Sequence, residues 1–325
     1  MLINISDVWA SARASHNLYL EGLIDDGLAS LGPSALDQRI KLFLEFLKIH
    51  LTAKNIYGLN SAISYHQKLQ RKISRHERIK VNDFLVELFD YKAFRRRKLR
   101  DWSAYKLCRS SNYRVCPYCH YSLMLVTEEK KGGIRPDLDH WYPQHLYPYL
   151  ALALNNLVPS CLICNSRLKG SADMHINPHL HPFLDSESLH FRCEKPGSSI
   201  VDIITDFENV KDQLSVRIDF NGACQKSTNT LTLFQLRERY ALLSPDGAKF
   251  VGRKTYSDGL EDWFQAHLMG PLHQTPPVPQ LKDRAKEIRQ LGFDRQDYKN
   301  EVFGKMYADL YDQYDRTSLL NNPYP

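Results

Sequence analysis

The chain has 325 residues, of which 43% are hydrophobic and 25% are charged, as is usual for a folded globular protein. At this length we expect more than one structural unit. The first residues lack a basic start followed by an apolar run, so no secretory signal is predicted. Prolines and asparagines interrupt the longest uncharged stretch, residues 141–166, which argues against a membrane-spanning helix. We therefore expect a cytoplasmic protein without a membrane partner.

Basic charge is concentrated in one part of the chain. The formal net charge is +6, but residues 61–115 alone hold 15 Lys and Arg against 5 Asp and Glu. The excess lies in two runs, residues 71–80 and 95–100. Such a concentration favours a partner with a phosphate backbone. The alternative is a pair of solvated helix faces, and the two runs alone do not decide between these interpretations.

The first hundred residues are predicted to be helical. Apolar residues recur at three- and four-residue spacing from Leu36 to Leu47, which predicts an amphipathic helix with Ser34 as its N-cap. Two further helices are predicted at about 61–73 and 81–97, the last of them ending in the second basic run. Residues 1–30 carry no motif.

Beyond about residue 107 the pattern changes to short segments with prolines, glycines and paired cysteines, and it changes again near residue 185. Apolar and polar residues alternate over residues 213–220, which is typical of a half-buried strand. Helical periodicity then returns, and the proline-rich stretch Gln274–Pro279 is predicted to be a linker. The strands are predicted at 189–193, 199–207 and 213–220, and the helical stretches at 228–269, with a break near residue 245, and 281–313.

Two CxxC pairs are the first chemical signal. Cys116 and Cys119 form one pair, and Cys161 and Cys164 form the other. Two such pairs are the usual source of four thiolates at about 2.3 Å from a tetrahedral zinc ion. The 41 residues between the pairs exceed the spacing of a simple zinc ribbon, so we expect a substantial insert that the zinc closes into a loop.

Asp139 and His140 lie inside that predicted loop, in the segment DLDHWYP. A histidine beside an aspartate is usually structural. What makes this pair a candidate site is the order of the motifs around it: a CxxC pair, then Asp139-His140, then Asn156-Leu157, then a second CxxC pair followed directly by Asn165. We interpret Asp137 as a polar strand residue, and we do not expect His120, next to Cys119, to serve as a ligand.

The segment DLDHWYP…NNLVPSCLICNSRLKG resembles the HNH endonucleases, whose core is two antiparallel strands and a helix around one metal ion. The resemblance covers about residues 113–172, roughly a fifth of the chain. It implies that Asp139 and Asn165 hold a divalent metal ion, that His140 is the general base, and that Asn156 holds the loop and the histidine in place. Many relatives have histidine at the position of Asn165; an amide oxygen there suits Mg²⁺ or Mn²⁺.

This set of residues also has a chemical logic of its own. Hydrolysis of a phosphodiester needs an activated water, and an imidazole with a pKa of about 6.5 can accept its proton near neutral pH. A divalent ion supplies Lewis acidity at the phosphate and at the departing 3′ oxygen. A four-cysteine zinc site is closed to substrate, so its expected role is structural. We therefore expect two kinds of metal site, one of structural zinc and one of catalytic Mg²⁺ or Mn²⁺.

The basic residues near this segment are candidates for nucleic-acid binding. Arg167 and Lys169 follow Asn165 and either contact the phosphate backbone or form a solvated face. No recognition motif is evident, so low sequence specificity is expected. Double-stranded DNA is the expected partner, and the sequence leaves RNA and single-stranded substrates open. Candidates from the second basic run are Arg95, Arg96, Arg97, Lys98 and Arg100.

The predicted fold class is α+β: a helical region at 1–106, an HNH core with its zinc pairs at 107–185, and a mixed strand and helix region at 186–325. The resemblance implies an endonuclease, with anti-phage defence as the expected context by analogy and a partner protein of a defence system as a further expectation. The alternative function is a zinc-stabilised nucleic-acid-binding module without catalysis, or a subunit that docks partners in a larger complex. Replacing His140 distinguishes the nuclease from the non-catalytic alternative, because only a nuclease needs this histidine for activity.

Overall fold

The computed structural model describes residues 2–53, 57–96, 101–128, 133–220, 222, 224–268 and 279–315. Arg97, Lys98 and Arg100 lie outside these residues, as does the predicted proline-rich linker apart from Pro279. Helices and two small sheets together confirm the α+β class. In the part of the chain described, no helix is long and apolar enough to cross a membrane.

The chain divides into two compact units. The N-terminal unit comprises Asn4–Pro117 and Leu123–Asp185, and the C-terminal unit comprises Met1–Ile3, Tyr118–Ser122 and Ser186–Pro325. The three-part division of the sequence at residues 106 and 185 stays a proposal.

Several helices of the N-terminal unit begin at serine caps. The Ser34 hydroxyl accepts a hydrogen bond from the Asp37 N–H, which confirms the predicted N-cap, and Ser74 forms a reciprocal capping box with Glu77. The single helix predicted at 81–97 is wrong. The chain breaks before Asp90, whose carboxylate accepts the N–H groups of two following residues and so starts a new helix. The six helices are α1 (Arg13–Ser30), α2 (Ala35–Thr52), α3 (Tyr57–Arg71), α4 (Arg75–Leu88), α5 (Tyr91–Arg96) and α6 (Ala104–Arg109).

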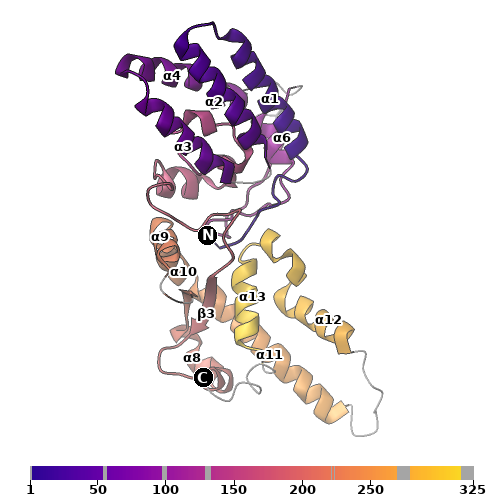
Figure 1. The fold of residues 1–325 in the computed structure, drawn as a ribbon. Coiled ribbons are helices and arrows are strands. Elements are labelled where there is room, and N and C mark those ends of the chain that lie inside the picture. The colour runs from indigo at the N-terminus through magenta and orange to yellow at the C-terminus, as the bar shows by residue number, and fades with distance from the viewer. Residues whose placement is uncertain are drawn as a thin grey trace. The chain divides into compact units, whose positions relative to one another are not determined.

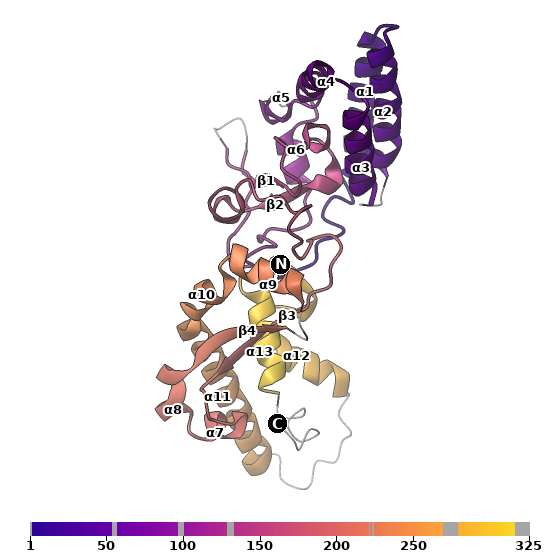
Figure 2. The same ribbon diagram turned by 60° about the vertical axis from the view of Figure 1, so that its left-hand side comes forward.

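Helix α2 packs against α1 and α3, as Figures 1 and 2 show in indigo to purple. Its residues Phe43, Leu44 and Leu47 are fully buried, as the apolar spacing predicts. Phe43 also meets the edge of the Tyr149 ring at 5.3 Å between centroids. Tyr149 belongs to the loop that follows strand β1, so the helical layer supports the segment that carries Asp139 and His140.

A short hairpin forms the centre of the N-terminal unit (Figure 2). Strands β1 (Asp137–His140) and β2 (Leu157–Ser160) pair antiparallel, with Asp139 opposite Val158 and His140 opposite Leu157. This confirms the two predicted strands. Elements η2 (Pro148–Leu150) and η3 (Leu154–Asn156) are single 3₁₀ turns in the connecting loop. A π-helix, η4 (Ile163–Lys169), follows β2 and carries Asn165.

His16 is fully buried in this unit and its tautomer follows from its partners. Nδ1 accepts a hydrogen bond from the Trp102 indole at 3.1 Å, so Nε2 carries the proton and donates it to the Leu152 carbonyl at 2.7 Å. Burial lowers the pKa of His16 to about 4. Protonation of Nδ1 would also break the bond to Trp102, so the folded protein holds His16 neutral.

We expect the N-terminal unit to lose stability as the pH falls from about 6.5 to about 4. In this window the unfolded chain protonates His16 and the folded chain does not, so stability is retained above the window and lost within it, by on the order of 3 kcal/mol. The measurement is the free energy of unfolding against pH for the wild type and for His16→Gln. The variant should show a flatter dependence. His76→Gln, at an exposed position on α4, is the control; equal slopes for His16→Gln and the wild type would contradict the prediction.

The C-terminal unit contains the second sheet. Strands β3 (Leu189–Glu194) and β4 (Ser215–Phe220) pair antiparallel, which confirms the strands predicted at 189–193 and 213–220. Buried residues alternate with more exposed ones along both, and this was predicted for β4. The strand predicted at 199–207 is wrong. Ser199 and Asp202 form a capping box there, which satisfies the free N–H groups of a helix start and favours helix over strand. The connection holds α7 (Ile200–Thr205), α8 (Phe207–Val210) and the 3₁₀ turn η5 (Lys211–Gln213).

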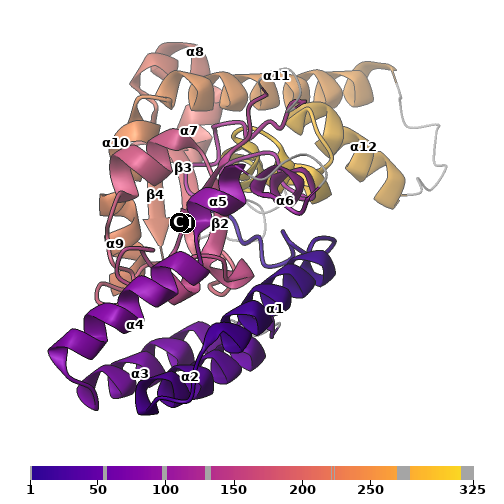
Figure 3. The ribbon, with the colours of Figure 1, turned by 90° about the horizontal axis from the view of Figure 1, so that it is seen from above.

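Helices cover this sheet, with α13 on β3, and α10 and α11 on β4. Figure 3 shows α11 as a long helix with α12 beside it. Between them lies a buried polar network: Lys254 on α11 pairs with Asp258 at 3.1 Å, and Gln290 on α12 donates to the same carboxylate at 2.7 Å. The helical elements are α9 (Gln225–Leu233), α10 (Leu236–Ala241), α11 (Ser244–Leu268), α12 (Pro279–Leu291), η6 (Arg295–Asn300) and α13 (Gly304–Gln313).

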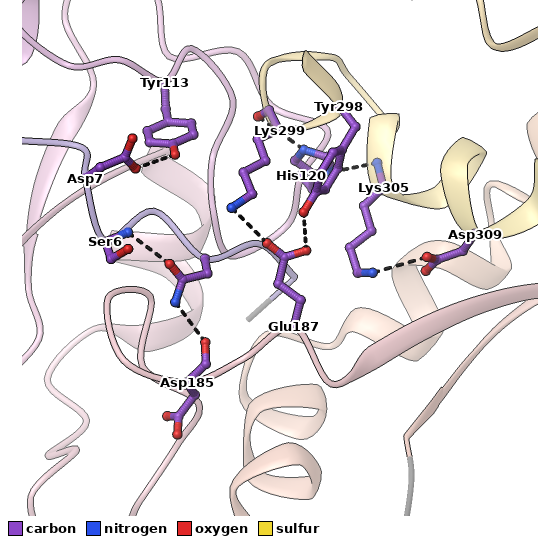
Figure 4. Close-up of polar contacts among 11 residues, drawn as sticks. Ser6, Asp7, Tyr113, His120, Asp185, Glu187, Tyr298, Lys299, Lys305 and Asp309 are labelled. Atoms are coloured by element: carbon purple, nitrogen blue, oxygen red, sulfur yellow. Dashed lines mark hydrogen bonds and ion pairs between the residues drawn. The ribbon is translucent and has the colours of Figure 1, made fainter. Parts of the chain in front are cut away.

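His120 is buried in the C-terminal unit and bonded to backbone groups (Figure 4). Its Nδ1 accepts from the Lys305 N–H and its Nε2 faces the Lys299 carbonyl, both at 3.3 Å. The neighbouring Glu187 carboxylate accepts from the Tyr298 hydroxyl at 2.6 Å and pairs with the Lys299 ammonium. Both ring nitrogens of His120 are thus engaged, which agrees with the expectation that it is not a zinc ligand.

Candidate metal and catalytic site

His140 lies at the end of β1, where burial and one hydrogen bond determine its protonation. Its Nε2 lies 2.9 Å from the Ala151 carbonyl, which can only accept, so Nε2 carries the proton. The Tyr91 ring meets the imidazole edge-on at 4.5 Å between centroids. Burial lowers the pKa of His140 to about 4, although Asp139 and the Ala151 carbonyl act in the opposite direction. The imidazole is therefore neutral at pH 7, with its lone pair on Nδ1.

Asn156 is fully buried and closes the loop between the two strands. Its side-chain oxygen accepts from the Tyr142 N–H at 2.7 Å, and its amide nitrogen donates to the carbonyls of Tyr142 and Leu150 at 3.1 and 3.0 Å. The Asn156 carbonyl also accepts from the Trp141 N–H at 2.9 Å. One residue is thus bonded near both ends of the loop that begins directly after His140.

Asp139 forms a buried ion pair with Lys169. The Lys169 ammonium lies 2.9 Å from Asp139 Oδ1, and the two side chains are only 1% and 2% exposed. The same ammonium donates to the His140 carbonyl at 2.7 Å. Sequence reasoning offered two roles for Lys169, a contact with backbone phosphate or a solvated face. Neither describes this buried position, which depends on the path of η4.

Asn165 lies on η4 and donates to Asp137 Oδ2 at 3.0 Å. The π-helical turn is evident in the bond from the Gly170 N–H back to the Asn165 carbonyl, five residues apart, at 2.8 Å. Insertions of this kind occur often at functional sites. Asp137, expected to be a plain polar strand residue, instead ties Asn165 to β1.

These residues line one cavity of about 780 Å³. Asp139, His140, Asn165 and Lys169 all reach it, whereas Asn156 lies in the loop behind it. An aspartate and an asparagine oxygen at the same cavity are the hard donors that Mg²⁺ and Mn²⁺ prefer, so the residues present fit such an ion. Besides these, the lining includes Tyr91, Arg95, Arg96, Tyr105, Arg135, Asp137 and His145.

Of the predicted nucleic-acid-binding residues, Arg95 and Arg96 line this cavity, and Arg167 is exposed on η4 without lining it. Sequence reasoning missed Arg135 and His145. Arg135 is two residues ahead of Asp137 on the entry to β1, so the strand assignment could have found it. His145 enters the cavity from the loop after β1, and its sequence neighbourhood carries no signal for this position.

The four cysteines gather at a single point. The sulfur atoms of Cys116, Cys119, Cys161 and Cys164 all lie within 4.8 Å of one another. The Cys161 N–H donates to Cys116 Sγ at 3.4 Å, and the Cys164 N–H donates to Cys161 Sγ at 3.5 Å. A tetrahedral ion with Zn–S bonds of about 2.3 Å needs sulfurs a little under about 4 Å apart, so the cluster can hold zinc.

The remaining cysteines do not belong to this cluster. Cys108 and Cys193 are buried, and burial raises the pKa of each thiol to about 12. Cys224 is half-buried. None of the three belongs to a metal-binding group among the described residues.

Comparison with known proteins gives one partial similarity. Over 97 residues the chain is 33% identical to the Septu protein PtuB of Bacillus thuringiensis. The aligned region covers 27% of this chain and 35% of that protein, so the chain spans about a third of the length of the relative it matches. No family model matches the chain, and no solved structure matches it significantly.

Proposed function

We propose that this protein is a metal-dependent endonuclease of the HNH type that hydrolyses phosphodiester bonds in DNA. The observation that carries the proposal is the meeting of Asp139, His140 and Asn165 at one cavity, on a β-hairpin followed by a helix. The partial similarity to Septu protein PtuB supports placing the activity in anti-phage defence, together with a partner protein of such a system.

In this proposal His140 is the general base, acting through Nδ1. Its Nε2 proton is committed to the Ala151 carbonyl, which fixes the ring and leaves the Nδ1 lone pair to take a proton from water. Burial keeps the base free of a proton at neutral pH, although a pKa of about 4 also makes it a weak one. The adjacent Asp139 carboxylate offsets part of this effect by favouring the imidazolium form.

Asp139 and Asn165 would hold the divalent ion, and Asn156 would keep the loop after His140 in place. The ion, when bound, supplies Lewis acidity at the phosphate and at the leaving 3′ oxygen. Arg95, Arg96 and Arg135 give the cavity a cationic wall suited to a phosphate backbone. The four cysteines would hold a structural zinc ion that ties the two CxxC turns together.

Cleavage of supercoiled plasmid by the zinc-loaded protein, with and without added Mg²⁺ or Mn²⁺, tests the proposal. We expect nicking or linearisation only with the added ion. Asn165→Ala should reduce the rate by about a hundredfold at equal zinc content, since a ligand is lost. Asn82→Ala makes the same substitution at an exposed position on α4 and should cut like the wild type.

Parallel assays with single-stranded DNA and RNA identify the substrate class. Equal cutting by Asn165→Ala would show that the metal site is misassigned or that the activity is a contaminant. If no preparation cuts any substrate while DNA still binds, the non-catalytic zinc module replaces the nuclease as the function.

A further inference from the structure

Lys169 holds the carboxylate that the proposed function assigns to the metal ion. It is the last residue of η4, and its ammonium contacts Asp139 Oδ1 at 2.9 Å and the His140 carbonyl at 2.7 Å. With side chains only 1% and 2% exposed, this pair is shielded from water and salt. The positive charge of Lys169 beside Asp139 is therefore built into the fold.

Two cations cannot share one buried carboxylate without strong repulsion. We infer that Lys169 is an internal competitor for Asp139: its ammonium must leave the carboxylate when a divalent ion binds, and this exchange sets the metal affinity. The inference rests on the proposed function, because it takes Asp139 as a ligand. Lys169 thereby becomes part of the metal site, in which the resemblance to the HNH endonucleases gave it no role.

The buried pair also has a simpler interpretation, in which Lys169 only clamps η4 to β1 and holds Asp139 in position. The two interpretations predict opposite results. If Lys169 is a clamp, neutralising it leaves Asp139 misplaced and weakens metal binding. If Lys169 is a competitor, the same change leaves the carboxylate without its cation, so a divalent ion binds more tightly even though the metal-free protein is less stable.

The test is a titration of the zinc-loaded full chain with Mn²⁺, in which binding is measured by calorimetry or by electron paramagnetic resonance. We expect Lys169→Met to tighten Mn²⁺ binding by roughly tenfold, within the range usual for coupled sites. Lys169→Gln keeps a donor for the His140 carbonyl without the charge and should tighten binding similarly, which provides a second variant if the first folds poorly. Zinc content and unfolding temperature are checked for each.

Two matched variants separate local competition from general charge. Lys169→Arg retains the cation and should bind Mn²⁺ like the wild type. Arg167→Met removes the same charge from an exposed position on the same π-helix and should change the Mn²⁺ affinity little. A second readout is the rise in unfolding temperature on adding Mn²⁺, which should be larger for Lys169→Met than for the wild type.

Asp139→Asn distinguishes failure of the inference from failure of the proposed function. If this change abolishes Mn²⁺ binding but Lys169→Met and Lys169→Gln bind Mn²⁺ no more tightly than the wild type, Lys169 is a clamp and only the inference is overturned. If Asp139→Asn leaves Mn²⁺ binding unchanged, alone and combined with Lys169→Met, Asp139 is not a ligand. The metal assignment and the inference then fail together.

Discussion

Replacing His140 with alanine is expected to reduce cleavage of supercoiled plasmid by about a thousandfold while zinc and DNA binding persist. Positioned general bases contribute about 10²–10⁴ in rate, and His140 is the histidine that strand β1 places at the cavity. The Nδ1 lone pair is the group that disappears, because Nε2 is engaged with the Ala151 carbonyl. The measurement is the initial rate of nicking at saturating Mg²⁺ or Mn²⁺, with zinc content matched between preparations.

The loss of a buried ring will also lower stability, since the Tyr91 edge contact is removed and a cavity remains. His66→Gln controls for this effect. His66 is half-buried on α3, packs 4.6 Å from the Tyr149 ring, and does not line the cavity. It should lose stability and still cut. Cleavage by His140→Ala at the wild-type rate would remove His140 from the mechanism.

Replacing Cys161 or Cys164 with serine is expected to release the zinc ion. The segment that this ion closes into a loop should then unfold. Structural zinc contributes about 10–16 kcal/mol of apparent binding free energy in small domains, which exceeds the stability of most domains. Two N–H to sulfur bonds within the cluster would be weakened at the same time. The measurements are zinc per chain by mass spectrometry, hydrogen exchange across residues 116–164, and cleavage rate.

Cys224→Ser is the matched control, because Cys224 is half-buried and outside the cluster. It should retain one zinc per chain and full protection. The zinc assignment fails if the wild type purifies without zinc yet remains folded, or if Cys161→Ser keeps its zinc and its exchange protection.

Local signals in the sequence predicted much of the fold. Ser34 was recognisable as a cap because its hydroxyl and the following apolar spacing agree, and β4 was recognisable from strict alternation. The strand predicted at 199–207 failed because its apolar residues are compatible with either structure, and the Ser199–Asp202 capping box decides for a helix. Where two local signals compete, the side chain that satisfies backbone N–H groups has the larger effect.

The site was predictable in its members but not in its contacts. The resemblance to the HNH endonucleases implied that Asp139, His140 and Asn165 lie together, and the structure brings them to one cavity. The partnership of Lys169 with Asp139, and of Asn165 with Asp137, depends on how a π-helix turns its side chains toward β1. In an α-helix the side chains of Asn165 and Lys169 would point in other directions. The sequence of residues 163–169 contains no signal that predicts the wider π-helical turn.

The polar network between α11 and α12 constrains how these helices can slide past one another. Contacts between apolar helix faces are not directional, so a small shift of the helices costs them less than it costs a hydrogen bond. Here such a shift would separate Gln290 from Asp258 and leave a buried carboxylate without part of its hydrogen bonding. The bond from Gln290 to Asp258 therefore fixes the alignment of α11 with α12, and it favours one packing of the two helices over neighbouring ones.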